Sequence, residues 1–251
     1  MKAADLPTDY NMCEILERNL EQRADKTALL SEHGSLTFRE VSDQVNQVGN
    51  ALTRLGVRFG ECVAILCPDR PEWVTTFFAT AKIGGVVLGM NTLLTTEEYD
   101  YILKDARVRV LVVYDSLLAL VEPILSNHTM LTKVIVIGVD EGMNYTTFTD
   151  WIYGEDTKLE AEQTHRDDFC SLHYSSGTTG KPKCICHGTG GVLLQHNKEL
   201  QIHSDIKDND KVFYFTTCGW MMWNWLISSL SVGATICLLY TSPSPRDATL
   251  S

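Results

Sequence analysis

Two runs rich in β-branched residues, 108–114 (VRVLVVY) and 133–139 (KVIVIGV), set the strongest limit on what this chain can fold into. Apolar runs of this kind, without polar alternation, are typical of strands that are buried on both faces. A stretch with helical character, 117–125, lies between them, although Pro123 weakens its second half. Strands that alternate with helices predict an α/β fold with a mainly parallel sheet flanked by helices.

The same alternation begins earlier in the chain. Thr37 and Glu40 have the spacing of a helix capping box, and apolar residues then recur at helical intervals as far as Gly56. Pro71 fits the first turn of a second helix, and 95–98 predicts the start of a third. Short apolar runs between these helices, at 62–66 and 86–90, predict strands.

A second alternation follows an acidic and polar stretch, 140–168, which we interpret as a surface connection. Its predicted strands are 169–174, 212–216 and 234–239, and its predicted helices are 191–202 and 222–230. We therefore predict a first α/β subdomain over 1–165 and the start of a second over 166–239. The pattern then stops, because 240–251 holds two prolines and three serines and has no apolar period.

The charge balance argues against nucleic acid as a partner. The net charge is −11, from 32 acidic and 21 basic residues, whereas binding a nucleic acid needs clustered Lys and Arg. No apolar run reaches the roughly 18 residues of a membrane span, and 1–10 has no secretory pattern. Eight cysteines, several of them inside apolar runs, favour a reduced, cytoplasmic protein.

The loop that follows the run 169–174 has the composition of an anion-binding site. Ser175, Ser176, Thr178 and Thr179 place four hydroxyls in one loop. Gly177 and Gly180 allow the backbone N–H groups to approach an anion closely, and Lys181 and Lys183 add positive charge. It is not a Walker A loop, because only two residues separate the glycines and Pro182 follows Lys181. On composition alone, a solvated turn with two lysines is the favoured explanation of the loop.

The ten-residue string 174–183, YSSGTTGKPK, is more specific than its composition. It resembles the phosphate-binding signature of the adenylate-forming superfamily, which includes acyl- and aryl-CoA synthetases. The segment 91–95 (NTLLT) is similar to benzoate-type CoA ligases, and 216–224 (TTCGWMMWN) is similar to acetoacetyl-CoA synthetases. Cys184 departs from the pattern, because the family usually has glycine there.

The resemblance implies the incomplete N-terminal domain of an ATP-dependent carboxylate–CoA ligase that acts on a short-chain or aromatic acid. In such a reaction ATP and a carboxylate give an acyl-adenylate and pyrophosphate, with Mg²⁺, and coenzyme A then displaces AMP. It also implies that the loop residues contact the β- and γ-phosphates of ATP. Three residues, Trp220, Trp223 and Asn224, fall where the family shapes its acyl pocket.

The expected catalytic residues do not appear in these 251 residues. The family's magnesium-binding Glu lies in an aromatic-Gly-x-Thr-Glu motif that this sequence lacks, and its adenylation Lys belongs to a C-terminal domain. The alternative is therefore a catalytically incomplete fragment that at most binds nucleotide. We expect 240–251 to be a tail foreign to the family, and we hypothesise that it was translated from sequencing-adapter DNA.

The motif Cys184-x-Cys186-His187 could be a metal site, a nucleophile with its base, or part of a strand. No second ligand pair stands nearby at zinc spacing, so we predict no metal site there. Alternation favours a strand with both cysteines on one face. His187, His196 and His203 have no i,i+4 spacing, and we expect them at the surface or in packing contacts.

Overall fold

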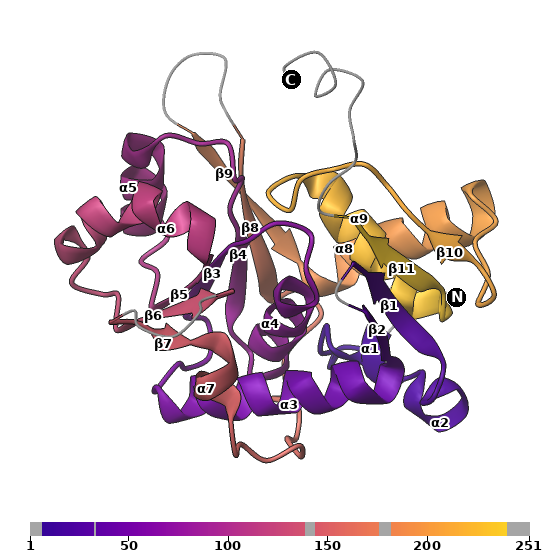
Figure 1. Cartoon of the computed structure of the whole chain (residues 1–251). Helices are drawn as coiled ribbons and strands as arrows, with labels where there is room; N and C mark the ends of the chain where they lie inside the picture. The colour runs from indigo at the N-terminus through magenta and orange to yellow at the C-terminus, as the bar shows by residue number, and fades with distance from the viewer. Residues whose placement is uncertain (1–6, 33, 139–143, 176–181, 240–251) are drawn as a thin grey trace, which may run out of the picture.

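The computed structural model describes residues 7–32, 34–138, 144–175 and 182–239. Within these ranges the chain forms two sheets with helices around them (Figure 1). The larger sheet has seven strands in the order β7-β6-β5-β3-β4-β8-β9, and all are parallel except β9. The smaller sheet has four strands in the order β10-β11-β1-β2. The predicted α/β fold with a mainly parallel sheet is confirmed.

The strands have the following bounds. In the larger sheet they are β3 (Cys62–Leu66), β4 (Val86–Gly89), β5 (Val110–Tyr114), β6 (Lys133–Ile137), β7 (Thr146–Thr147), β8 (Phe169–Ser175) and β9 (Lys183–Gly188). In the smaller sheet they are β1 (Thr27–Ser31), β2 (Gly34–Thr37), β10 (Lys211–Val212) and β11 (Thr235–Leu238).

The helices have the following bounds. The α-helices are α1 (Glu14–Glu17), α2 (Leu20–Arg23), α3 (Phe38–Arg54), α4 (Pro71–Lys82), α5 (Thr96–Asp105), α6 (Asp115–Val121), α7 (Phe148–Ile152), α8 (Thr189–Lys198) and α9 (Met221–Ser228). Three helical turns continue them, η2 (Glu122–Asn127), η3 (Glu199–His203, a π-helix) and η4 (Ser229–Val232).

Local sequence signals account for where several helices begin. Thr37 and Glu40 form the predicted capping box before α3, and Thr95 and Glu98 form a second one before α5. Pro71 is the first residue of α4, where its missing N–H leaves no hydrogen bond unmade. Gly56 has a φ of +79°, the left-handed conformation that suits the residue after a helix.

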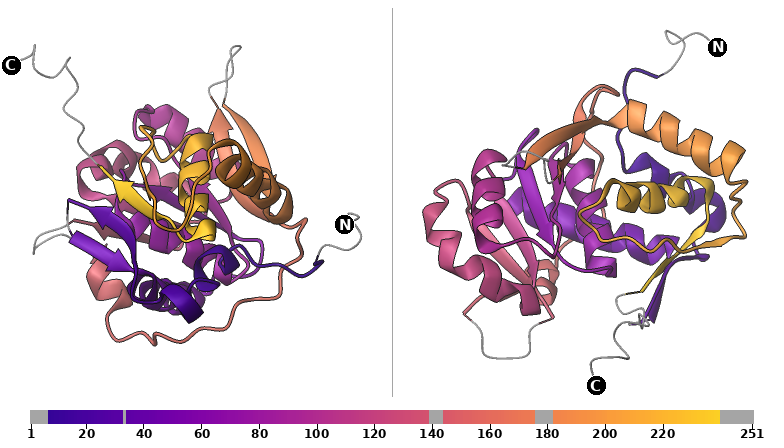
Figure 2. Two further views of the ribbon diagram at one scale, coloured as in Figure 1. Left: turned by 90° about the vertical axis from the view of Figure 1, so that its right-hand side faces the viewer. Right: turned by 90° about the horizontal axis from the view of Figure 1, so that it is seen from above.

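The two faces of the larger sheet bury two hydrophobic cores. In β3, for example, Val63 and Ile65 point into one core, and Ala64 and Leu66 point into the other. The first core lies against α3, α4 and α9, and the second lies against α5 and α6. In Figure 2 the helices accordingly lie on both sides of the central sheet.

Each of the two sheets pairs strands that are far apart in the sequence. β8 pairs with β4 in the larger sheet, and β11 pairs with β1 in the smaller one. The division that we predict at residue 165 therefore does not separate two sets of strands, and it stays a prediction. The segment 240–251 lies outside the described residues.

Two of the predicted elements differ from the structure. The stretch 140–168, expected to be a surface connection, includes strand β7 and helix α7, whose Phe148 and Trp151 are buried. The strand predicted at 212–216 is only Lys211–Val212. Beyond Val212 the chain leaves the smaller sheet, and at Gly219 it passes the segment that follows β4, where an added Cβ would lie 2.4 Å from the backbone nitrogen of Asn91.

Candidate functional site

The candidate site lies at the open end of the β8–β9 hairpin. The two strands are antiparallel, and Ser175 at the end of β8 pairs with Lys183 at the start of β9. Both residues are exposed. β8 runs parallel to β4, so this end of the hairpin stands at the carboxyl edge of the larger sheet. Ligands of open α/β sheets bind at that edge.

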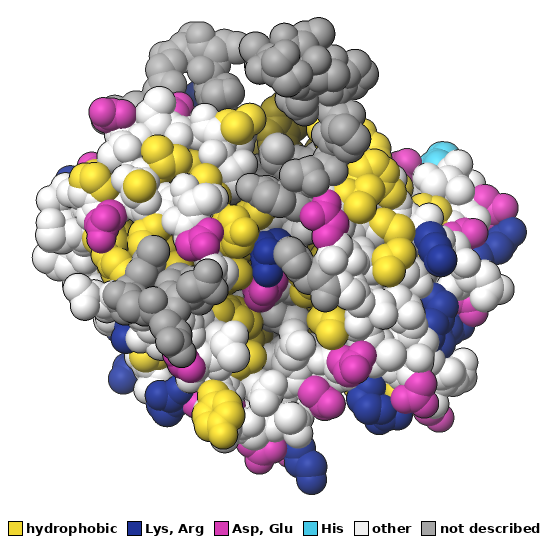
Figure 3. Space-filling model, in the orientation of Figure 1, with side chains coloured by type: hydrophobic (Ala, Val, Ile, Leu, Met, Phe, Trp, Pro, Cys, Tyr) yellow, Lys and Arg dark blue, Asp and Glu magenta, His cyan; other side chains and the backbone are white. Residues whose placement is uncertain are grey.

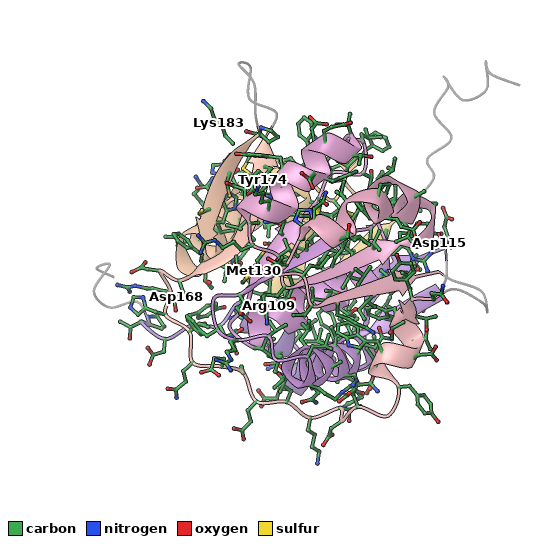
Figure 4. The ribbon with its side chains drawn as sticks, turned by 90° about the vertical axis from the view of Figure 1, so that its left-hand side faces the viewer. Arg109, Asp115, Met130, Asp168, Tyr174 and Lys183 are labelled. Carbon is green, nitrogen blue, oxygen red and sulfur yellow. The ribbon has the colours of Figure 1, made fainter. Side chains whose placement is uncertain are left out.

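Seven residues lie between them, and six of these, Ser176, Gly177, Thr178, Thr179, Gly180 and Lys181, lie outside the described residues. Their predicted contacts with phosphate stay predictions. The two ends of the segment are nevertheless defined, because Ser175 and Lys183 are partners in the strand register. Figure 4 shows Lys183 and Tyr174 near this end of the hairpin, and Asp168 near the opposite end.

Tyr174 ties the hairpin to the neighbouring helix. Its hydroxyl donates a hydrogen bond of 2.7 Å to Oδ2 of Asp105, the last residue of α5. Burial and this bond to a carboxylate both raise the pKa of Tyr174 far above its usual range, so the phenol stays protonated and remains a donor. The contact fixes the strand end immediately before the loop.

A cavity of about 270 Å³ lies beside this end of the hairpin. Its walls come from β8, β9, the segment after β4, and the residues that open α9. The lining residues are Asn91, Leu94, His173, Tyr174, Ser175, Ile185, Gly219, Trp220 and Met221. The volume is near the lower end of the range for small-molecule pockets, and the walls are mostly apolar with a few polar groups.

Close backbone packing holds one wall in place. Gly219 lies so near Asn91 that an added Cβ would come within 2.4 Å of the Asn91 nitrogen. The carbonyl of Asn91 in turn accepts a hydrogen bond of 2.8 Å from the Tyr99 hydroxyl in α5. Only glycine allows the two chain segments to approach this closely, so Gly219 determines where Trp220 and Met221 stand.

The three residues predicted to shape the acyl pocket occupy different places. Trp220 lines the cavity and is 61% exposed. Trp223 is fully buried and packs edge-on against Trp73, with ring centroids 5.3 Å apart. Asn224 is buried behind the cavity, where it contacts His173. The structure therefore brings Trp220 to the cavity and places Trp223 and Asn224 in the core behind it.

His173 is a site residue that the sequence argument missed. It lines the cavity and is only 5% exposed. Its Nε2 lies 2.6 Å from Nδ2 of Asn224, and its ring centroid lies 4.8 Å from that of His187. Burial, followed by the charges of His187 and His196, lowers the pKa of His173 to about 4, so the ring is neutral at neutral pH. A histidine inside an apolar strand directly before the loop was the available signal.

The other histidines and cysteines that the sequence singled out have the following positions. His196 is buried and its Nδ1 lies 2.8 Å from the Ser228 hydroxyl. Cys184 and Cys186 lie in a strand, as predicted, and both are exposed, although Lys183 and Ile185 in the same strand are exposed as well. No group of three or more potential metal-ligating side chains occurs in the described parts of the chain. All eight cysteines fall within those parts, and each is a free thiol.

Asp69, beyond the end of β3, is a second ionisable group that the sequence argument missed. Burial raises its pKa to about 6, and a hydrogen bond from the Cys218 thiol, 3.2 Å away, partly offsets that effect. Cys218 directly precedes Gly219, so this contact helps to hold the cavity wall. It joins residues 149 positions apart in the sequence, which no local pattern reveals.

The part of the surface around α9 is rich in exposed hydrophobic side chains. They include Phe213, Tyr214, Phe215, Trp220 and Met221. In Figure 3 hydrophobic side chains gather at the upper right of this face, beside the residues drawn in grey. Among the described residues, no helix is both long and apolar enough to cross a membrane.

Comparison with known proteins identifies the family. The family model for AMP-binding enzymes matches residues 16–250. The acetoacetyl-coenzyme A synthetase of Rhizobium meliloti (strain 1021) is 34% identical over 84% of this chain and 35% of its own length. The benzoate–CoA ligase of Thauera aromatica is 34% identical over 97% of this chain and 46% of its own length. The chain thus spans about a third to a half of the length of these curated relatives.

Solved structures give the same family. The anthranilate CoA ligase AuaEII, solved in complex with anthranoyl-AMP, superposes with a TM-score of 0.91 and 44% identity over 100% of this chain and 49% of its own. The acetoacetyl-CoA synthetase of Streptomyces lividans gives a TM-score of 0.84 and 32% identity over 94% of this chain and 39% of its own. The chain belongs to the family of AMP-binding enzymes, with acyl-CoA ligases among its relatives.

Proposed function

We propose that this chain carries the nucleotide- and acyl-binding part of an ATP-dependent carboxylate–CoA ligase. The observation that carries the proposal is the position of the hairpin end. Ser175 and Lys183 are paired and exposed there, and Ser175 also lines the adjoining cavity. A phosphate-binding loop and an acyl pocket must meet in such an enzyme, because the carboxylate attacks the α-phosphate of ATP.

The described residues at the two ends of the loop have side chains that suit the binding of a polyphosphate. The Lys183 ammonium and the Ser175 hydroxyl are charged and neutral donors at the two ends of the loop. Together with the hydroxyls and backbone N–H groups of 176–181, they would hold the β- and γ-phosphates and offset the negative charge on the departing pyrophosphate. Mg²⁺ would accompany the nucleotide, and coenzyme A would accept the acyl group in the second step.

The residues that line the cavity favour an aromatic acid over a short-chain acid as the substrate. Leu94, Ile185, Trp220 and Met221 supply apolar walls, which match a planar ring better than a small polar acyl group. The relatives act on both classes by name, as benzoate–CoA ligase and acetoacetyl-CoA synthetase do. The structure with 44% identity holds the adenylate of an aromatic acid.

The alternative is a chain that binds nucleotide without completing adenylation. This alternative is considered because the chain spans only 35% and 46% of the lengths of the two curated relatives. Carboxylate-dependent exchange of pyrophosphate into ATP distinguishes the two functions. We expect the protein with the relatives' full length to exchange with aromatic carboxylates, and exchange with no carboxylate in a broad panel would refute the ligase proposal. Saturable ATP binding without exchange by the 251-residue chain would support the alternative for this chain.

A further inference from the structure

Two exposed thiols lie on the edge strand of the larger sheet. Cys184 and Cys186 belong to β9, the last strand in the sheet order, and both are free and exposed. Alternate residues of a strand point to the same face, so the two thiols share one face of β9. Each of the other six cysteines is buried or half-buried. The proposed function uses neither of the two exposed thiols.

The side chain of Cys184 lies between a fixed tyrosine and the second thiol. Burial raises the pKa of Cys184, a hydrogen bond with Tyr174 lowers it in part, and the nearby Cys186 thiol raises it further. Tyr174 is the partner of Cys184 on β8, and its hydroxyl donates a hydrogen bond of 2.7 Å to Asp105. The two sulfur atoms are therefore close enough to influence one another, on a hairpin that is tied to α5.

A disulfide between these two residues does not fit an extended strand. A strand rises by about 3.3 Å per residue, so side chains two residues apart on one face have Cβ atoms about 6.6 Å apart. A disulfide needs a Cβ–Cβ distance of about 3.5–4.5 Å. Because the thiols can meet only if the backbone between them shortens, β9 must bend at Ile185 when the bond closes.

The bend would act on the end of the hairpin that carries the candidate site. Among the described strands, β9 pairs only with β8, so a single ladder of hydrogen bonds opposes the bend. Ile185 is paired with His173, and the open end beyond it finishes with the pair of Lys183 and Ser175. Loss of pairing at Ile185 thus removes the support of this last pair. Strained, exposed disulfides are easily reduced, so the change is reversible.

We propose that Cys184 and Cys186 form a reversible oxidation site, at which an intrastrand disulfide unpairs β9 from β8 at the open end of the hairpin. The oxidant is glutathione disulfide. One protein thiolate attacks it, forms a mixed disulfide and releases one glutathione thiolate. The second protein thiolate then attacks the protein sulfur of the mixed disulfide and releases the other. Two protein thiols thus become one disulfide, and one glutathione disulfide becomes two glutathione molecules, which take up the two protons.

Treatment of the 251-residue chain with glutathione disulfide, followed by peptide mass spectrometry, tests the site. We expect a bond between Cys184 and Cys186 that reduced glutathione reverses. Hydrogen exchange of the backbone amides of 183–188 should become at least about tenfold faster in the oxidised chain, because their pairing is lost. Cys184→Ser and Cys186→Ser should stop at a mixed disulfide and keep slow exchange. Cys237→Ser, at a half-buried thiol in β11, is the matched control and should behave like wild type.

Three results would overturn the proposal. They are a disulfide of the wild-type chain that involves any other cysteine, a wild-type chain that remains reduced or stops at a mixed disulfide, and unchanged exchange in the oxidised chain.

The effect of Mg²⁺ and ATP separates this proposal from the proposed function, on which only this part rests. A nucleotide held by the paired hairpin opposes its opening, so ATP at about ten times its Kd should lower the equilibrium ratio of oxidised to reduced chain about tenfold. Saturable ATP binding that leaves this ratio unchanged would contradict the link between oxidation and the hairpin end. If ATP does not bind while the disulfide forms and exchange rises, the nucleotide site fails and the oxidation site stands.

Discussion

The amide nitrogen of Asn224 lies 2.6 Å from Nε2 of His173, so helix α9 orients a ring of strand β8 that lines the candidate acyl cavity. The contact spans 51 residues of sequence. It also explains why Asn224 can influence the cavity without lining it.

Replacing Asn224 with leucine should destabilise the fold. The change keeps the number and branching of the side-chain heavy atoms but leaves Nε2 of His173 and the Ser171 hydroxyl without the amide donor. Because a buried hydrogen-bond partner is lost, we expect the free energy of unfolding to fall by about 1–3 kcal/mol. Urea titration measures this difference. Asn209→Leu, at an exposed position, is the matched control. Equal stability of the two variants would show that the buried contact contributes nothing.

Gly219→Ala should disturb the cavity wall. The new methyl group would lie 2.4 Å from the Asn91 nitrogen, so one backbone segment must move. We expect a loss of about 1–3 kcal/mol in unfolding free energy, typical of overpacking, together with weaker binding of aromatic carboxylates. Gly191→Ala in α8 is the control, because an added Cβ there has nothing within 4 Å and should stabilise the helix by about 0.5–1 kcal/mol. A Gly219→Ala chain as stable as wild type would contradict the close approach.

Asp69 should make stability depend on pH. Burial raises its pKa to about 6 in the folded chain, against about 3.9 in an unfolded chain. Between these values the folded state binds more protons, so its stability falls as the pH rises from about 4 to about 6 and is level above that. Asp69→Asn removes this loss of stability, because the asparagine side chain does not titrate. It also keeps an oxygen that can accept the hydrogen bond of the Cys218 thiol.

The difference between wild type and Asp69→Asn is therefore the quantity to measure. We expect the variant to be more stable by about 1–3 kcal/mol at pH 7.5, and the advantage to disappear near pH 4. Asp25→Asn, at a side chain that is 89% exposed, controls for the removal of one negative charge. An advantage of the same size at both pH values would contradict a raised pKa.

Tyr174→Phe should loosen the strand end that leads into the proposed phosphate-binding loop. The variant keeps the ring and loses the hydrogen bond to Asp105. Hydrogen exchange of the backbone amides at the open end of the β8–β9 hairpin should become about tenfold faster, as expected when a contact of about 1.4 kcal/mol no longer opposes local opening. Tyr153→Phe, at an 85% exposed residue, is the control. Unchanged exchange in Tyr174→Phe would show that the strand end is held by other contacts.

Much of the fold could be predicted from the sequence, because its signals are local. The capping box at Thr37, the helix start at 95–98 and the proline that opens α4 involve neighbours in the chain, and all three are confirmed. The buried runs identified strands β5 and β6 in the same way, although each strand is shorter than its run.

The candidate site was less predictable, because distant contacts build it. The loop motif predicted Ser175 and Lys183 as phosphate contacts, which stays a prediction, and family resemblance drew attention to Trp220, which lines the cavity. The roles of His173 and Asp69 depend on partners 51 and 149 residues away.

Binding of ATP to the 251-residue chain tests most directly the claim that the open end of the β8–β9 hairpin is a nucleotide phosphate site. Calorimetric titration with Mg²⁺ and ATP should give saturable binding that Lys183→Ala weakens about tenfold, through loss of a charge-assisted contact. Lys211→Ala, which removes an exposed lysine from β10, should leave the affinity unchanged. No saturable binding by the wild-type chain, or equal affinities of the two lysine variants, would contradict the claim.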